Sequence, residues 1–67
     1  MQFYAVHYNE EGTHEVGVYE AGTDEVLTTI TNENIGLDSE DEIDLTLEDI
    51  KEYLVDNNFI NYNDEVL

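Results

Sequence analysis

Apolar and polar residues alternate through the first half of the chain, as they do in half-buried β-strands. Gln2 to Tyr8 is rich in aromatic and β-branched residues, Thr13 to Ala21 shows the alternation, and a third strand is expected around Val26 to Thr31. Short runs of Asn, Glu, Asp and Gly separate them and have the chemistry of tight turns. The pattern predicts a three-stranded antiparallel meander.

The first turn decides which side chains of the first two strands meet. A turn centred on residues 10 and 11, both glutamates, places Tyr8 opposite Thr13. The same turn places His7 opposite His14. Alternation then puts Phe3, Ala5, Val16 and Val18 on one face, and Tyr4, Val6, Tyr8 and Tyr19 on the other. Two registers remain open for the third strand.

After residue 31 the period changes to that of a helix. Thr46 to Asp49 has the form of a capping box with Asp in place of the usual Glu. The helical apolar stripe consists of Leu47, Ile50 and Leu54, with Tyr53 beside it. We expect the helix to end near Asn57 and Asn58, because Asn tolerates the left-handed conformation found at helix C-termini.

The start of this helix has two interpretations. Residues 39–42 also form a capping box, and Ile43 would extend the stripe, but a helix starting there turns Leu45 toward solvent. We therefore favour the shorter helix, with 38–45 as an acidic loop or short strand. Residues 32–37 are expected to be a connection broken by Gly36, residues 59–62 a returning extended segment, and residues 64–67 a frayed end.

Together these elements predict one α+β domain: an antiparallel sheet of three to four strands with one acidic helix. Its parts are a meander over 1–31, an acidic loop plus helix over 38–58 and an extended tail over 59–67. Because a core of this size is small, we expect a homodimer to supply additional stability.

Composition narrows the possible functions. The 67 residues include 18 Asp and Glu, one Lys and no Arg, for a net charge of -17. Such charge is typical of disordered chains, but 40% of the residues are apolar and they are patterned, which favours a folded domain. Direct binding to nucleic acid or to an anionic membrane is not expected, because a basic patch is missing. Without a membrane-length apolar run or a basic leader, a cytoplasmic protein is expected.

Candidate chemistry is sparse. The sequence has no nucleophile elbow, phosphate-binding glycine loop or dinucleotide fingerprint, so no catalytic residue and no cofactor are expected. His7 and His14 could hold a zinc or nickel ion together with Glu15 or with a second copy of the chain. The favoured interpretation is that both are partly exposed residues of the sheet. A calcium loop starting at Asp38 would place Ile43 where the motif needs glycine. We therefore expect no dedicated metal site.

Carboxylates dominate the second half. On a helix through 41–56, Asp44, Glu48, Glu52 and Asp56 recur every four residues opposite the apolar stripe, with Asp41, Glu42 and Asp49 beside them. This spacing presents an anion about every 6 Å, so two staggered rows approach the charge density of a DNA strand, with one phosphate about every 3.4 Å. With the shorter helix, Asp41 and Asp44 move to the loop that adjoins it.

A solvated surface normally mixes charges of both signs, yet Lys51 is the chain's only Lys or Arg. Like charges four residues apart destabilise a helix, so the composition has a cost that solubility does not explain. Two explanations compete: a mimic of nucleic acid, and a surface adapted to molar salt. Salt-adapted chains favour Arg and are poor in Asn, Ile and Tyr, whereas this chain has no Arg, seven Asn, five Ile and five Tyr. The mimic is favoured.

Small size, extreme acidity, absence of Cys and a strand-rich layout with one acidic helix resemble the DNA-mimic proteins of bacteriophages. This group inhibits restriction enzymes, uracil-DNA glycosylase, CRISPR effectors and the histone-like protein HU, and the inhibitors of HU are most similar in size and charge. The resemblance covers the whole chain in composition and layout, without a shared motif. It implies a basic DNA-binding protein of the host as partner, with HU as the first expectation and a defence nuclease as an alternative.

The carboxylates expected to contact this partner are Asp41, Asp44, Glu48, Asp49, Glu52 and Asp56, with Glu40 and Glu42 in support. Tyr53 or Tyr62 could add an aromatic anchor. For Tyr4, Tyr8 and Tyr19 the alternatives are core packing or the seam of a dimer.

Overall fold

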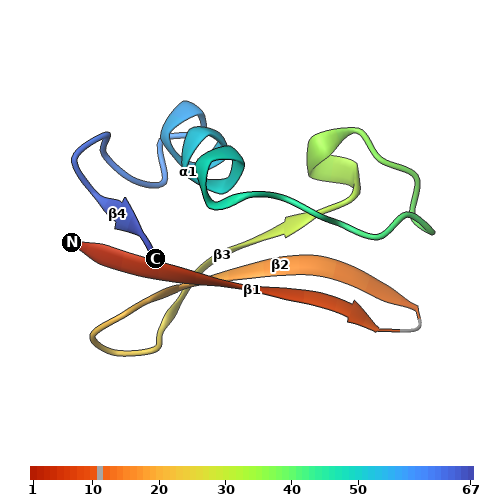
Figure 1. Cartoon of the computed structure of the whole chain (residues 1–67), viewed down its shortest axis with the longest axis horizontal. Coiled ribbons are helices and arrows are strands. Elements are labelled where there is room, and N and C mark those ends of the chain that lie inside the picture. Colours follow the sequence, from red (N-terminus) through yellow and green to blue (C-terminus); the bar gives the residue numbers. More distant parts are fainter. Residues whose placement is uncertain (11) are drawn as a thin grey trace.

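A four-stranded sheet and one α-helix form two layers in the computed structural model, which describes residues 1–10 and 12–67 (Figure 1). The elements in chain order are β1 (Gln2–Glu10), β2 (Thr13–Glu20), β3 (Val26–Thr31), the short 3-10 helix η1 (Glu33–Ile35), α1 (Leu47–Asp56) and β4 (Glu65–Val66). The strand order is β3-β2-β1-β4, with β4 parallel to β1 and the other pairs antiparallel. The predicted α+β class is confirmed, and the sheet is mostly antiparallel.

The β1–β2 hairpin differs from the prediction in register. Glu10 lies opposite Thr13 and Tyr8 opposite Glu15, a shift of two residues along β2. β1 runs further than expected, so the loop is shorter, and Gly12 at φ 83° takes the left-handed conformation that such tight turns need. Glu11, at the centre of the predicted turn, lies outside the described residues.

The predicted faces are nevertheless correct, because a shift by two residues leaves every side chain on its side of the sheet. Phe3, Val16 and Val18 are buried on one face, and Ala5 packs against them. The tyrosines of β1 and β2 lie on the other face. The open register of β3 is resolved by the pairing of Ile30 with Val16, with an irregularity opposite Val18 and Tyr19.

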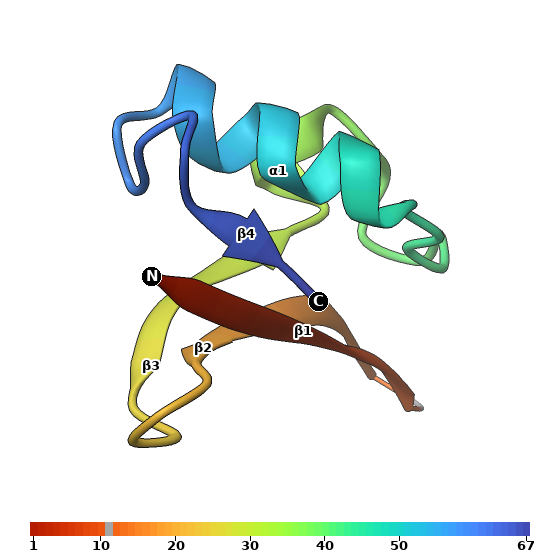
Figure 2. The same cartoon turned by 60° about the vertical axis from the view of Figure 1, so that its left-hand side comes forward.

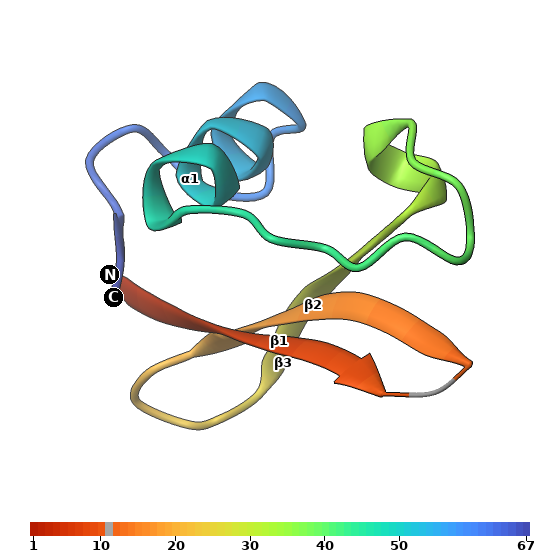
Figure 3. The same cartoon turned by 45° about the vertical axis from the view of Figure 1, so that its right-hand side comes forward.

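α1 covers the first face only, as Figures 2 and 3 show from two sides. The core joins side chains from the sheet, from α1 and from the two segments that flank it: Phe3, Val16, Val18, Ile30, Ile43, Ile50, Leu54 and Ile60. None of the described helices covers the opposite face of β1, β2 and β3.

The shorter helix is confirmed. Thr46 Oγ1 accepts a hydrogen bond from the Asp49 N–H at 3.1 Å, and Asp49 Oδ2 accepts one from the Thr46 N–H at 3.3 Å, which completes the predicted capping box. At the other end Asn57 is the C-cap and Asn58 has φ 62°. The predicted stripe is wrong at Leu47, which is 49% exposed.

Ile43 is buried although it precedes α1, because Asn9 of β1 holds this segment against the sheet. The Asn9 side chain donates to the Ile43 carbonyl and accepts from the Ile43 N–H, both at 3.0 Å. His7 Nε2 accepts from the Leu45 N–H at 3.3 Å. Residues 38–45 therefore form an acidic loop, the first of the two predicted alternatives.

The predicted fraying of residues 64–67 is wrong. Glu65 donates its N–H to the Met1 carbonyl at 3.0 Å, and Leu67 donates to the Phe3 carbonyl at 2.7 Å, so β4 extends the sheet beside β1. Val66 is half-buried against the core, and burial of its apolar side chain stabilises the pairing of this short strand with β1. Before it, residues 59–64 turn instead of running extended.

Candidate acidic interface on helix α1

The carboxylates of the predicted interface are all exposed and fall into two groups. α1 carries Glu48, Asp49, Glu52 and Asp56. The preceding loop carries Glu40, Asp41, Glu42 and Asp44. The single row of four on one helix is thus divided, because Asp44 precedes the capping residue Thr46.

On α1 the direction of the acidic row follows from what the helix buries. Ile50 and Leu54 point into the core, so Glu52 lies directly opposite them, and Glu48 and Asp56 lie one turn to either side. These three carboxylates form a row on the solvent side, with a rise of about 6 Å between neighbours. We call Glu48, Glu52 and Asp56 the helix row.

Two of the predicted site residues also serve the fold. The Asp49 carboxylate completes the capping box. Asp41 accepts a hydrogen bond from the Asp38 N–H at 3.3 Å, and the buried Asn32 side chain donates to the carbonyls of both residues. Their carboxylates are partly committed within the chain, whereas no side-chain hydrogen bond involves the helix row among the described residues.

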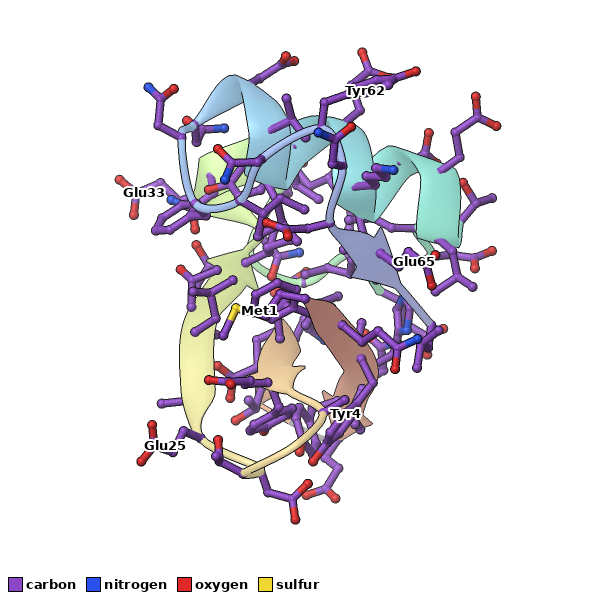
Figure 4. All side chains as sticks on the ribbon, turned by 90° about the vertical axis from the view of Figure 1, so that its left-hand side faces the viewer. Met1, Tyr4, Glu25, Glu33, Tyr62 and Glu65 are labelled. Atoms are coloured by element: carbon purple, nitrogen blue, oxygen red, sulfur yellow. The ribbon has the colours of Figure 1, made fainter. Side chains whose placement is uncertain are left out.

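A groove runs along one side of the helix row. It lies between α1 and the turn at Tyr62, has a volume of about 310 Å³, and is lined by Glu48, Lys51, Glu52, Val55, Asp56 and Tyr62. Tyr62 is 78% exposed, and the Lys51 ammonium lies 5.1 Å from the centre of its ring. In Figure 4 Tyr62 lies beside α1, at the far side of the molecule from Tyr4 and Glu25. The sequence pattern indicated Tyr62 as a candidate aromatic anchor but did not predict that it lies beside the helix row.

The second aromatic candidate is placed differently. Tyr53 is half-buried, packs against the core and stacks on Phe59 with ring centres 6.4 Å apart. Its position supports the packing of α1 against the 59–64 turn and is not that of an exposed anchor.

Three tyrosines form a connected cluster on the bare face of the sheet. Tyr4 and Tyr19 stack with ring centres 5.3 Å apart, and the Tyr8 and Tyr19 hydroxyls are hydrogen-bonded at 2.8 Å. Tyr4 donates its hydroxyl to Asp24 at 2.7 Å, and this bond is the main reason why the pKa of Tyr4 is raised. The hydrogen bond with Tyr8 likewise raises the pKa of Tyr19. Both phenols are therefore held in their neutral form.

The predicted cross-strand pairing of His7 with His14 is wrong, because the shorter hairpin loop changes their partners. His7 lies opposite Val16, and His14 lies opposite Asn9. His14 Nδ1 is 3.2 Å from Asn9 Oδ1, so both imidazoles have hydrogen-bond partners within the chain. Across residues 1–10 and 12–67 no three His, Asp or Glu side chains are grouped so that they could hold a metal ion.

Comparison with protein-family models, with curated proteins and with solved structures gave no match. In the part of the chain that the structure describes, neither helix has the length and apolar character needed to cross a membrane.

Proposed function

We propose that this chain is a DNA mimic: its acidic interface occupies the basic DNA-binding surface of a host DNA-binding protein and keeps DNA from binding there. The observation that carries this proposal is the helix row. Glu48, Glu52 and Asp56 stand on the solvent side of α1, and the chain's one Lys side chain lies over the Tyr62 ring instead of pairing with them. Among the described residues, the single ion pair joins the Met1 amino group to Asp64.

Unneutralised carboxylates four residues apart repel one another and weaken the helix that carries them. Cationic side chains of a partner would remove this repulsion. The free energy that the repulsion costs in the free protein would then be recovered when the partner binds. The net charge of -17 also accelerates the encounter with a basic surface through electrostatic steering. Both effects favour a partner that normally grips phosphates.

Among such partners the histone-like protein HU is our first candidate, and a restriction or CRISPR nuclease is the alternative. The target can be identified by immobilising the protein, passing a bacterial lysate over it at about physiological salt and eluting with a salt step. Recovery of one DNA-binding protein, competed by duplex DNA, is the expected result. A broad set of basic proteins would instead favour the salt-adapted surface.

Reversing charge on the helix row tests the interface directly. We expect Glu48→Lys combined with Glu52→Lys to weaken binding to the captured target by at least about 100-fold, because each change replaces an attraction by a repulsion. Both side chains are exposed, so circular dichroism should show an intact fold. Affinity is measured by titration calorimetry.

The matched control is Glu10→Lys combined with Glu25→Lys, which changes net charge equally at exposed positions on the two hairpin ends. We expect this control to lose far less affinity. Equal losses in the two double variants would mean that only total charge matters, and an unchanged affinity in the first would reject the helix row as the interface.

A further inference from the structure

The groove beside the helix row combines an apolar surface with a row of carboxylates. Its apolar part consists of the Val55 side chain and the exposed ring of Tyr62, and its rim carries the carboxylates of Glu48, Glu52 and Asp56. Its volume of about 310 Å³ lies at the lower end of the range of ligand pockets, about 300–1,000 Å³. A groove of this volume has room for one long side chain from a partner.

The position of Lys51 indicates that the face of the Tyr62 ring can bind a cationic side chain. Its ammonium lies 5.1 Å from the ring centre, within the distance of about 6 Å at which a cation is attracted to the face of an aromatic ring. Within the described residues this ammonium forms no ion pair with the rim carboxylates, although Lys51 and the rim line the same groove. In the free protein, therefore, the chain's own cation occupies the aromatic wall and the carboxylates stay unpaired.

A metal ion is a poor occupant for this groove. The rim carboxylates stand one helical turn apart, and among the described residues they are not grouped as metal ligands. A cation with an extended stem fits better, because its stem can lie on Val55 while its charged head reaches the ring and the rim.

We propose that the groove receives an arginine side chain of the partner protein. The guanidinium stacks on Tyr62 in place of the Lys51 ammonium and donates hydrogen bonds to carboxylates of the helix row. Arginine is preferred over lysine because its planar group both stacks on an aromatic ring and binds carboxylates through two parallel N–H groups. This assignment rests on the proposed function, since it names the element of the basic partner that α1 recognises.

In this arrangement Lys51 is an internal competitor. Lys51→Met keeps most of the side chain but removes the charge, so no ammonium of the chain itself competes with an incoming guanidinium for the Tyr62 ring. Tyr62→Leu removes the ring, and Tyr62→Phe keeps the ring while removing only the hydroxyl. The three variants separate the contribution of the aromatic face from that of total charge.

The test uses the full chain and two peptides of equal length and charge, one of six arginines and one of six lysines. We expect the arginine peptide to bind at least about threefold more tightly in calorimetry and to shift the Tyr62 ring signals in NMR spectra. Tyr62→Leu should abolish this preference, and Tyr62→Phe should retain it. Lys51→Met should raise the affinity for the arginine peptide about threefold or more.

Thr13→Glu is the control for Lys51→Met, because it lowers the net charge by one at an exposed position on the hairpin. We expect a smaller gain from it than from Lys51→Met. Equal gains from both variants, or a preference for arginine that survives Tyr62→Leu, would overturn the proposal.

Different experimental results would reject the arginine site and the proposed function. If Tyr62→Leu changes neither the peptide preference nor target binding while the Glu48 and Glu52 reversal abolishes target binding, the mimic stands and the arginine site is rejected. If the peptides behave as expected but no DNA-binding protein is captured from lysate, the arginine site stands and the proposed function is rejected.

Discussion

Tyr19 lies across Gly17 on the face of the sheet that α1 leaves bare. A Cβ atom at residue 17 would lie 2.6 Å from the Tyr19 hydroxyl oxygen and 2.9 Å from two ring carbons. The ring can lie flat on the strand only because the residue beneath it is glycine. Stacking on Tyr4 and the hydrogen bond with Tyr8 hold it there, so the tyrosines themselves shield this face.

Gly17→Ala should therefore destabilise the fold by about 1–3 kcal/mol, because the added methyl displaces the Tyr19 ring and disturbs both of its contacts. Urea unfolding measures the change. Gly22→Ala is the matched control, since nothing lies within 4 Å of a Cβ at that position. A neutral or stabilising Gly17→Ala would show that the ring moves away without loss.

Asp64 is a carboxylate whose pKa is lowered by contacts within the folded chain. The hydrogen bond from the Asn61 N–H, at 2.9 Å, is the main cause of its lowered pKa, and the Met1 amino group adds to it. A carboxylate with a lowered pKa stabilises the folded state above its ordinary pKa and loses this contribution as pH falls through its folded pKa.

Asp64→Asn should consequently lower the Tm at pH 7, and the difference from the unchanged protein should shrink as pH falls below about 4. Thermal unfolding followed by circular dichroism at pH 7 and at pH 3 measures it. Asp44→Asn serves as the control at an exposed carboxylate, where removing one charge from the acidic surface should not lower the Tm. An equal change in both variants at pH 7 would contradict a specific role of Asp64.

At the scale of elements, α1 is defined by its capping box more than by its apolar stripe. The helix begins after Thr46, although Ser39 offers a second capping sequence and Ile43 continues the stripe. A helix starting at Ser39 does not form, because the Asn9 side chain binds both the N–H and the carbonyl of Ile43 and holds that segment along β1. A helix through residue 43 would have to break both hydrogen bonds.

Thr46→Ala should cost about 1 kcal/mol of stability, because the Asp49 N–H loses its acceptor at the helix N-terminus. Ser39→Ala should cost little, because no helix starts at that residue. Urea unfolding of the two variants compares them. A larger loss for Ser39→Ala would mean that the helix begins earlier in solution.

At the scale of the whole molecule, charge is distributed unevenly over the two sides. The helix row and the acidic loop lie on one side, while the bare face of the sheet presents the three tyrosines together with Val6 and Thr29. This face carries fewer carboxylates, among them Glu15 opposite Tyr8 and Asp24 at the Tyr4 hydroxyl. Two chains of this charge can approach closely only through a surface poor in carboxylates. If the expected homodimer forms, we expect it to use the tyrosine face, where the rings of Tyr4 and Tyr19 offer apolar contact area.

We therefore predict that dimerisation is promoted by salt, since screening reduces the repulsion between two chains of charge -17. Sedimentation equilibrium at about 0.02 M and about 0.5 M salt measures it, and Tyr4→Lys should weaken the dimer. A monomer under both conditions would reject the dimer and leave the tyrosines as a shield of the sheet.

The sequence pattern was enough to place the three strands and to assign the faces of the first two. The capping sequence at Thr46, together with the position of Leu45, was enough to favour the shorter helix. These features depend on near neighbours in the chain, which the sequence displays directly. The hairpin register could not be obtained in this way, because a slip by two residues preserves the same faces. The histidine pairing was wrong for that reason.

The features that depend on contacts between residues far apart in the chain were decided only by the tertiary structure. Burial of Ile43 depends on Asn9, far away in sequence, and β4 pairs with β1 where Val66 lies opposite Phe3 and packs against the core. The carboxylates of α1 could be read from the helical period once the buried residues were known. The groove could not, because only the turn that leads to β4 brings Tyr62 beside Lys51. The sequence alone determined the charge and the local periodicity. The position of Tyr62 beside the acidic helix row depends instead on the pairing of β4 with β1, which brings the C-terminal segment back to the N-terminal strand.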